Sequence, residues 1–226
     1  MDGMKAIVVK APREAAVQIV PMPVPAEGEV LVHIRKALIC TWEQRIFMGV
    51  DMPLPFVPGH EVSGEVAAIP EGTCTDLAVG DRVVVKTYDS CGACEQCYRG
   101  HDNLCKGKSK RRTYGGIPGA GGFAQYMAIA ANRVYRLPDQ DVSLDIAAFA
   151  EPLACCVHSM EQANVELGED VVIVGGGIMG QLHNLLAALR GRGSHWWSRT
   201  ESAGSWANGW EPTSSLILRP RMRWPA

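Results

Sequence analysis

Short runs of alternating apolar and polar residues dominate the first 150 positions, and proline and glycine separate them. Alternation with a period of two is typical of a strand with one buried face, and the breakers between runs mark turns. The strand-like runs are 6–9, 30–38, 60–69, 81–86 and 123–129. Many short strands with few helical stretches predict a compact, barrel-like β domain over residues 1–150.

The periodicity changes after this β-rich part. Residues 144–163 carry apolar side chains at helical spacing, and Pro152 stands where a helix can begin. A continuous apolar run at 171–174 predicts a parallel strand buried on both faces, and 178–190 again shows helical spacing. A strand followed by a helix indicates the start of an α/β domain, which we assign to residues 151–191.

Three glycines, Gly175, Gly177 and Gly180, lie between this strand and this helix in the order G-x-G-x-x-G. Glycine permits a tight turn and a close approach of the backbone, so that a pyrophosphate can bind the amides at the start of the helix. An ordinary glycine-rich turn of an α/β protein is the alternative. The position after a strand and before a helix favours a dinucleotide-binding turn.

Four cysteines, Cys91, Cys94, Cys97 and Cys105, lie within one segment, CGACEQCYRGHDNLC. Four thiolates at this spacing can bind one tetrahedral Zn²⁺ at about 2.3 Å each and leave no position open for a substrate, so the predicted metal site is structural. Two disulfides are the alternative that the spacing permits. The sequence has no apolar leader and no run long enough to cross a bilayer, which favours a reducing cytoplasm and therefore zinc.

The composition is that of an ordinary globular protein, with 47% apolar residues and a formal net charge of −2. One basic cluster, within residues 106–112, follows the cysteines, and a solvated loop accounts for it. Nothing typical of a nucleic-acid-binding surface surrounds this cluster. Neither a nucleic-acid nor a membrane partner is expected.

The motifs PGHEVSGEV, the four-cysteine segment, GGFAQY, EPLACCVH and VVIVGGGIMG follow one another in residues 4–191. In this order they resemble the zinc-containing medium-chain alcohol dehydrogenases, nearest to the polyol (sorbitol or L-iditol) and threonine dehydrogenase branch. The resemblance implies a GroES-like β-barrel catalytic domain followed by the start of an α/β Rossmann domain, which is incomplete here. It also implies homo-oligomers, NAD as cofactor with NADP left open, and a small alcohol or polyol as substrate.

The resemblance further implies a second, catalytic zinc bound by Cys40, His60 and Glu151, with Glu61 as an alternating or water-mediated partner. One thiolate, one imidazole and one carboxylate leave a fourth position free for water or an alcohol oxygen. The zinc would favour an alkoxide, which passes a hydride to the nicotinamide. Taken singly, these residues also fit ordinary structural roles: a core histidine, an apolar cysteine and an acid in the first turn of a helix.

The segment that follows Cys40 departs from the family pattern. The family usually continues with Gly, then Ser or Thr, then Asp, and often His two residues later, whereas this chain has Thr41, Trp42, Glu43 and Arg45. The hydroxyl and the later His usually carry the proton to solvent, which Trp42 and Arg45 cannot do in the same way. We expect proton release through water or Glu43, and a reshaped substrate pocket beside Trp42.

Residues 192–226 match neither helical nor strand periodicity, and they hold five of the six tryptophans and no lysine. We interpret them as an anomalous, disordered tail in place of the remaining Rossmann strands. Our hypothesis is a single-base frame change, because residues 195–198 re-read one base out of frame permit Leu-Val-Glu, a strand ending in an acid that would bind the ribose of NAD. A genuine divergent tail is the alternative, and sequencing the coding DNA decides between them.

The first functional hypothesis is a zinc-dependent oxidoreductase that transfers a hydride between a secondary alcohol or polyol and NAD(P). The alternative is a truncated, catalytically inactive zinc-binding fragment of such an enzyme, because activity needs a complete cofactor domain whereas zinc binding needs only residues up to about Glu151. A zinc-free reductase of the same superfamily is disfavoured by the four-cysteine segment together with Cys40, His60 and Glu151.

Overall fold

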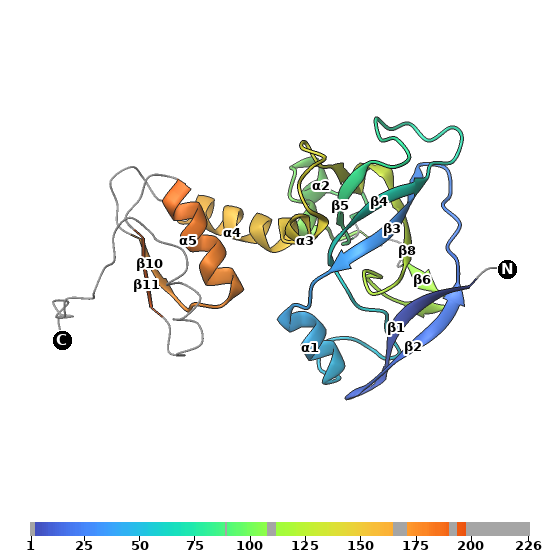
Figure 1. The fold of residues 1–226 in the computed structure, drawn as a ribbon, viewed down its shortest axis with the longest axis horizontal. Helices are drawn as coiled ribbons and strands as arrows, with labels where there is room; N and C mark the ends of the chain where they lie inside the picture. The colour runs from blue at the N-terminus through green and yellow to red at the C-terminus, as the bar shows by residue number, and fades with distance from the viewer. Residues whose placement is uncertain (1–2, 89, 108–111, 165–170, 190–193, 198–226) are drawn as a thin grey trace. The chain divides into compact units, whose positions relative to one another are not determined.

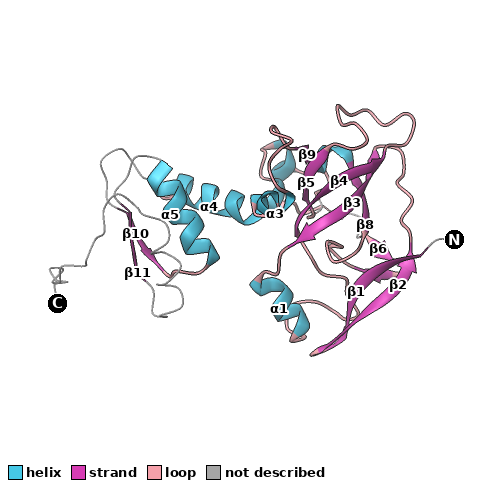
Figure 2. Ribbon diagram, in the orientation of Figure 1, coloured by secondary structure: helices cyan, strands magenta, loops and turns pink. Residues whose placement is uncertain are grey.

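The structure is a computed structural model of the chain (Figure 1). The residues that it describes are 3–88, 90–107, 112–164, 171–189 and 194–197. The chain divides into two compact units, Met1–Glu151 and Pro152–Ala226. Strands and loops make up most of the first unit (Figure 2).

The elements of the first unit follow one another as short strands with brief helices between them. In chain order they are β1 (Gly3–Ala11), β2 (Glu14–Pro21), β3 (Glu29–Ala37), α1 (Thr41–Phe47), β4 (Glu61–Ala68), β5 (Arg82–Lys86), α2 (Glu95–Tyr98), η1 (Asp102–Leu104), β6 (Thr113–Tyr114), β7 (Ile117–Pro118), β8 (Tyr126–Ala130), η2 (Ala131–Arg133), β9 (Val134–Arg136) and α3 (Leu144–Ala147). The predicted β-rich first part is thereby confirmed.

A five-stranded antiparallel sheet, in the order β8-β3-β4-β5-β9, forms the centre of this unit. β3 pairs with both β4 and β8, so that Val32 lies opposite Val66 and Met127. Alternate side chains of these strands enter one core, in which Val30, Val32, Val83 and Met127 are all 0% exposed. Each such side chain contributes about 1.5–3 kcal/mol by its burial, which fixes the face that each strand turns inward.

A glycine positions the residue that precedes β4. Gly59 has a φ of +98°, and a Cβ added there would lie 2.5 Å from the backbone nitrogen of Phe123. Only glycine accepts both this backbone conformation and so close a neighbouring chain. His60 is therefore held between Gly59 and the first residue of β4, Glu61.

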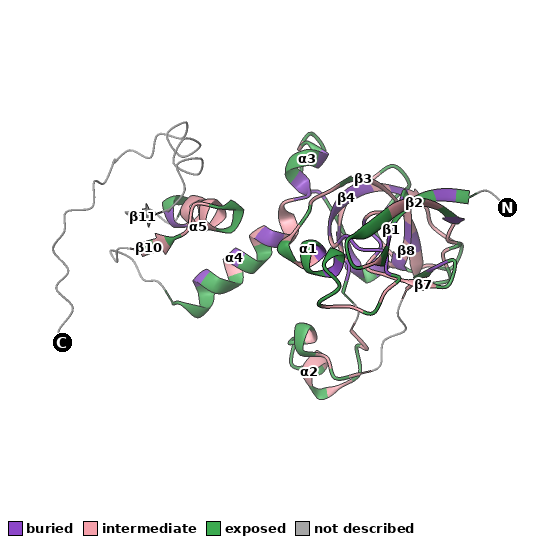
Figure 3. Cartoon of the chain, turned by 90° about the horizontal axis from the view of Figure 1, so that it is seen from below, coloured by how far each residue is buried: buried purple, intermediate pink, exposed green. Residues whose placement is uncertain are grey.

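The four-cysteine segment forms a small lobe with α2 and η1, which stands apart from the strands of the barrel (Figure 3). Polar contacts attach it: Lys86 of β5 donates to Asp102, and Arg133 donates to the carbonyl oxygens of Tyr88 and Ser90. No residue of α2 or η1 is buried. The lobe is thus held to the barrel mainly by charge and hydrogen bonds.

The second unit contains a parallel strand–helix–strand arrangement, the first part of a Rossmann domain. Its elements are α4 (Ala150–Gln162), which begins at the end of the first unit, then β10 (Val171–Val174), α5 (Ile178–Leu189) and β11 (Ser194–Trp197). β10 and β11 pair in parallel, and α5 packs on both. The prediction that residues 192–226 lack regular structure is wrong for Ser194–Trp197, and residues 198–226 lie outside the described residues.

The prediction that 171–174 is buried on both faces is also wrong. Val172 and Val174 are 55% and 76% exposed, whereas Ile173 lies on the side of α5. The main neighbours of β10 among the described residues are β11 and α5, and the face that carries Val172 and Val174 is exposed. In these same ranges no helix is both long enough and apolar enough to cross a membrane.

Candidate active site

The first turn of α1 begins at a candidate metal ligand. Cys40 is the residue at which the helix is capped, and its backbone N–H donates to Oε2 of Glu43 at 3.0 Å. An acid three residues after the cap is the usual way to satisfy this amide at the start of a helix. The local sequence Cys-x-x-Glu therefore fixes the backbone at Cys40.

The other carboxylate oxygen of Glu43 reaches a distant part of the chain. Oε1 accepts the backbone N–H of Gly59 at 3.2 Å and lies 2.6 Å from Nδ1 of His60. Glu43 is only 4% exposed, so water does not compete for these bonds. A carboxylate on Nδ1 fixes the ring and leaves Nε2 as the atom that can bind a metal.

Two groups of potential metal ligands share His60. In one, the ligand atoms of Cys40, Glu43 and His60 lie within 4.8 Å of one another, and in the other those of His60, Glu61 and Glu151 do. The structure therefore brings together all four residues of the implied catalytic site, although they come from segments up to 111 positions apart (151 − 40).

The pKa values in this cluster reflect burial and crowded negative charge. Burial raises the pKa of the Cys40 thiol, and the charges of Glu61 and Glu43 raise it further, against a lowering by the backbone of Trp42. Burial also raises the pKa of Glu61, which His60 lowers and Glu151 and Glu43 raise. Several acids lie around one imidazole, and a bound divalent cation would offset the repulsion between their negative charges.

Burial lowers the pKa of His60, but the hydrogen bond and charge of Glu43 outweigh it, and Glu151 and Glu61 add to the increase. The net pKa of His60 is raised. The main partner, Glu43, thus favours a proton on Nδ1, which is the tautomer that a metal at Nε2 requires.

Two residues that depart from the family pattern make other contacts. Arg45 donates two hydrogen bonds to Asp51, at 2.5 and 2.7 Å, and so closes the loop that follows α1. Trp42 packs against the rings of His60 and Phe56. Glu43, one of the two routes expected for proton release beside water, makes three hydrogen bonds, and its role in orienting His60 was not predicted.

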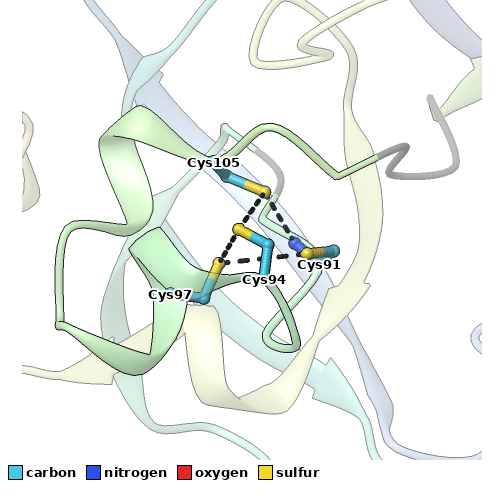
Figure 4. A group of neighbouring side chains, drawn as sticks. All are labelled: Cys91, Cys94, Cys97 and Cys105. Carbon is cyan, nitrogen blue, oxygen red and sulfur yellow. Dashed lines mark hydrogen bonds between the residues drawn. The ribbon is translucent and has the colours of Figure 1, made fainter.

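The four sulfur atoms of the lobe face one another (Figure 4). Cys94 lies 3.6 Å from Cys97 and 3.9 Å from Cys105, and Cys91 lies 4.0 Å from Cys97, sulfur to sulfur. Zn–S bonds of about 2.3 Å in a tetrahedron give sulfur–sulfur distances of about 3.8 Å. All four cysteines are free, so the arrangement fits one tetrahedral metal and not the alternative of two disulfides.

Backbone hydrogen bonds stabilise thiolate in this lobe. Those from Cys97 and Lys106 lower the pKa of Cys94 to about 6, and the N–H groups of Cys91 and Gly107 donate to the sulfur of Cys105 at 3.2 and 3.3 Å. Burial and the side chains of Cys94 and Cys105 instead raise the pKa of Cys97 to about 11. Because only the thiolate binds metal, the lowered pKa of Cys94 makes it the first ligand at neutral pH, and Cys97 must lose its proton as the metal binds.

The three glycines of the second unit have distinct surroundings. Gly175 has a φ of +114°, and a Cβ on Gly180 would lie 1.8 Å from the carbonyl oxygen of Gly175. A Cβ on Gly177 would meet nothing within 4 Å. These are the three properties of a dinucleotide-binding turn: a tight turn, an open approach and close helix–strand packing.

The barrel with its cysteine lobe and the strand–helix–strand unit with its glycine turn define a GroES-like domain followed by part of a Rossmann domain. Residues 26–139 match the family described as the alcohol dehydrogenase GroES-like domain. The chain belongs to this family.

Known relatives are dehydrogenases and reductases. An L-threonine 3-dehydrogenase from Coxiella burnetii (strain Dugway 5J108-111) is 36% identical over 173 residues, which are 74% of this chain and 48% of the relative. The chain thus spans about half the length of the curated relatives it matches.

Solved structures agree in fold. A protein from Sinorhizobium meliloti 1021, described as a zinc-binding dehydrogenase and bound to NADP, is 30% identical with a TM-score of 0.82 and matches 92% of this chain and 60% of its own. Acetophenone reductase from Geotrichum candidum NBRC 4597 in complex with NAD is 25% identical with a TM-score of 0.82 and matches 97% and 66%.

Proposed function

We propose that the chain is a zinc-dependent oxidoreductase that transfers a hydride between a secondary alcohol or polyol and NAD(P). One observation carries the proposal: Cys40, Glu61 and Glu151 converge on His60, whose ring Glu43 already orients. The glycine turn before α5 supports the cofactor, and the relatives named above support the reaction class.

The donor set of the cluster suits zinc. A thiolate, an imidazole and carboxylates are its usual ligands in catalytic sites, where three protein ligands leave one position for substrate. When bound, zinc supplies the Lewis acidity that favours the alkoxide form of an alcohol, and the nicotinamide accepts the hydride. A second zinc in the cysteine lobe would be structural, since four sulfurs complete its coordination.

The chain's own residues would orient the ligands and hold protons. Glu43 retains a proton on Nδ1 of His60 and so keeps Nε2 available. Glu61 is 7% exposed and belongs to the same ligand group as His60 and Glu151, so it would approach the metal directly or through a water molecule. At the glycine turn, the open space beside Gly177 would admit a pyrophosphate to the backbone.

A zinc-binding chain without turnover is the second candidate. The exposed side chains of Val172 and Val174 favour it, because in a complete cofactor domain further elements cover the first strand on both faces. The two candidates agree on metal binding in the first unit and differ in cofactor binding by the second.

The test is to purify the chain, count zinc by mass spectrometry, and titrate NADH while following its fluorescence. Oxidation of L-threonine and of sorbitol with NAD or NADP is then assayed. We expect two zinc ions per chain, and one after His60→Ala. His33→Ala is the matched control, because His33 lies on β3 and belongs to no potential metal group among the described residues.

Saturable NADH binding with turnover of either alcohol supports the proposed oxidoreductase. Two zinc ions without NADH binding favour the second candidate. If the chain binds only one zinc, and His60→Ala still binds it, then neither candidate function has a catalytic zinc at His60.

A further inference from the structure

Trp42 lies in the first turn of α1, between the candidate ligand Cys40 and the orienting residue Glu43. Its ring centroid is 5.1 Å from that of His60, with an angle of 87° between the ring planes. Perpendicular rings at this separation form a favourable aromatic contact. One helical turn therefore presents both a carboxylate and an indole to the same histidine.

The indole is itself anchored in the core. It meets Phe56 at a centroid distance of 5.9 Å and an angle of 90°, and Phe56 is 4% exposed. Phe56 packs with Val9 and Ile46, which are 3% and 0% exposed. Trp42 thus connects the ring of His60 to rigid, close-packed side chains, which have little freedom to shift.

The two contacts on His60 restrain different motions. The hydrogen bond from Nδ1 to Glu43 fixes one atom of the ring, but the ring can still tilt about that bond. A perpendicular indole against the ring opposes this tilt. Together, Glu43 and Trp42 define both the position and the plane of the imidazole.

We propose that Trp42 is a positioning residue of the catalytic metal centre, which holds the plane of His60 so that Nε2 remains directed at the metal. The inference rests on the proposed function, since it presupposes that His60 binds a metal. It assigns to Trp42 a role in metal affinity that is separate from proton transfer and from the cysteine lobe.

The size of the effect follows from the strength of aromatic contacts. Loss of one such contact corresponds to a decrease in zinc affinity of about 2- to 10-fold at this centre. Trp42→Leu removes the ring and keeps an apolar side chain that can pack on Phe56. Trp42→Phe keeps an aromatic ring, so it should restore most of the affinity.

A second aromatic–imidazole pair supplies the matched control. Tyr126 of β8 stacks on His33 of β3 with a centroid distance of 4.4 Å and an angle of 17°. His33 belongs to no potential metal group among the residues that the structure describes. Tyr126→Leu therefore removes an aromatic neighbour from a histidine without affecting a metal site.

The experiment titrates the metal-free, reduced chain with Zn²⁺ against a chromophoric chelator and fits two classes of site. His60→Ala identifies the catalytic class, and the cysteine lobe is the internal reference. We expect Trp42→Leu to weaken the catalytic class about 2- to 10-fold, Trp42→Phe to recover it, and Tyr126→Leu to change neither class. Circular dichroism of each variant checks that it is folded.

Three results overturn the inference. Trp42→Leu could bind zinc as the unchanged chain does, Trp42→Phe could be as weak as Trp42→Leu, or both classes could weaken together, which indicates general loss of structure. If the unchanged chain has no class that His60→Ala removes, the proposed function fails as well, and this outcome is distinct from the other three.

Discussion

Glu43 makes three hydrogen bonds, to the backbone at Cys40 and Gly59 and to the ring of His60. It is buried, and it joins the segment that contains Cys40 to the segment that contains His60. Glu43 contributes to metal affinity as well as to local stability, because a histidine that is not held in place binds its metal less tightly.

Replacing Glu43 with glutamine keeps the size of the side chain and removes its charge. We expect zinc affinity at the catalytic centre to fall about 10- to 100-fold, the usual effect of losing a partner that orients a metal-bound histidine. Competition titration measures it. Glu71→Gln, at an exposed position, is the control and should change nothing; equal affinities for the two variants would contradict the orienting role.

Gly59 permits a second prediction at the scale of one residue. Gly59→Ala should destabilise the chain by about 2 kcal/mol or more, because alanine is strained at positive φ and its Cβ would lie 2.5 Å from Phe123. Gly28 also has a positive φ, +81°, but a Cβ there meets nothing within 4 Å. Gly28→Ala should therefore cost only about 1–2 kcal/mol, and urea unfolding compares the two. Equal losses would show that the close approach of Phe123 does not matter.

At the scale of elements, the cysteine lobe is attached to β5 by the ion pair of Lys86 and Asp102. The hydrogen bond from Lys86 holds the pKa of Asp102 below its ordinary value despite partial burial. An acid whose pKa is lowered on folding stabilises the folded chain above its unfolded pKa, and this contribution is lost as the pH falls through the lowered pKa.

We therefore expect Asp102→Asn to reduce the free energy of unfolding at pH 7, with the difference from the unchanged chain shrinking as the pH falls below about 4. Urea unfolding of the zinc-loaded chain at several pH values measures this, with the bound zinc counted at each pH. Glu95→Gln is the control, because the pair of Glu95 with Arg99 is mostly exposed, at 71% and 65%, and contributes little. A difference that persists unchanged into acid would contradict the ion pair as its source.

Removal of metal tests the lobe as an element. The sulfur atoms have the spacing of a tetrahedral site, and α2 and η1 have no buried residue, so the metal should supply most of the order of the lobe. On chelation, amide exchange should increase in 91–107 by at least tenfold and remain slow in β3, β4 and β5. Exchange that rises equally in these strands would mean that the lobe and barrel unfold together.

Over the whole molecule, the sequence predicts which residues form strands better than it predicts which strands pair. The alternation at 30–38 and 60–69 identifies β3 and β4, yet it contains nothing about the order β8-β3-β4-β5-β9, because pairing joins strands distant in the chain. The hairpin strand β2 was missed, since Val17 and Ile19, 63% and 68% exposed, blur its pattern. For β10, burial was overestimated because an apolar run does not reveal which neighbours cover it.

The same distinction applies to the sites. Spacing alone predicts the cysteine lobe, because its four ligands lie within one segment. Cys40, His60 and Glu151 are too far apart in sequence for any local pattern to connect them, so only resemblance to a family indicated them. The role of Glu43 had one local signal, its position three residues after a helix cap, and the contact with His60 could not be read from it.

The bridge through Glu43 has a consequence for how this chain can change. Substitutions at two ligands in separate segments would ordinarily add, but Cys40 and His60 serve one metal and are both positioned by Glu43, so their effects should not be additive. A chain that loses His60 retains a buried Glu43 with only its two backbone hydrogen bonds, and loss of the Cys40 thiol then costs less because the metal is already lost. We therefore expect substitutions that remove the metal centre to occur together at Cys40, His60 and Glu43.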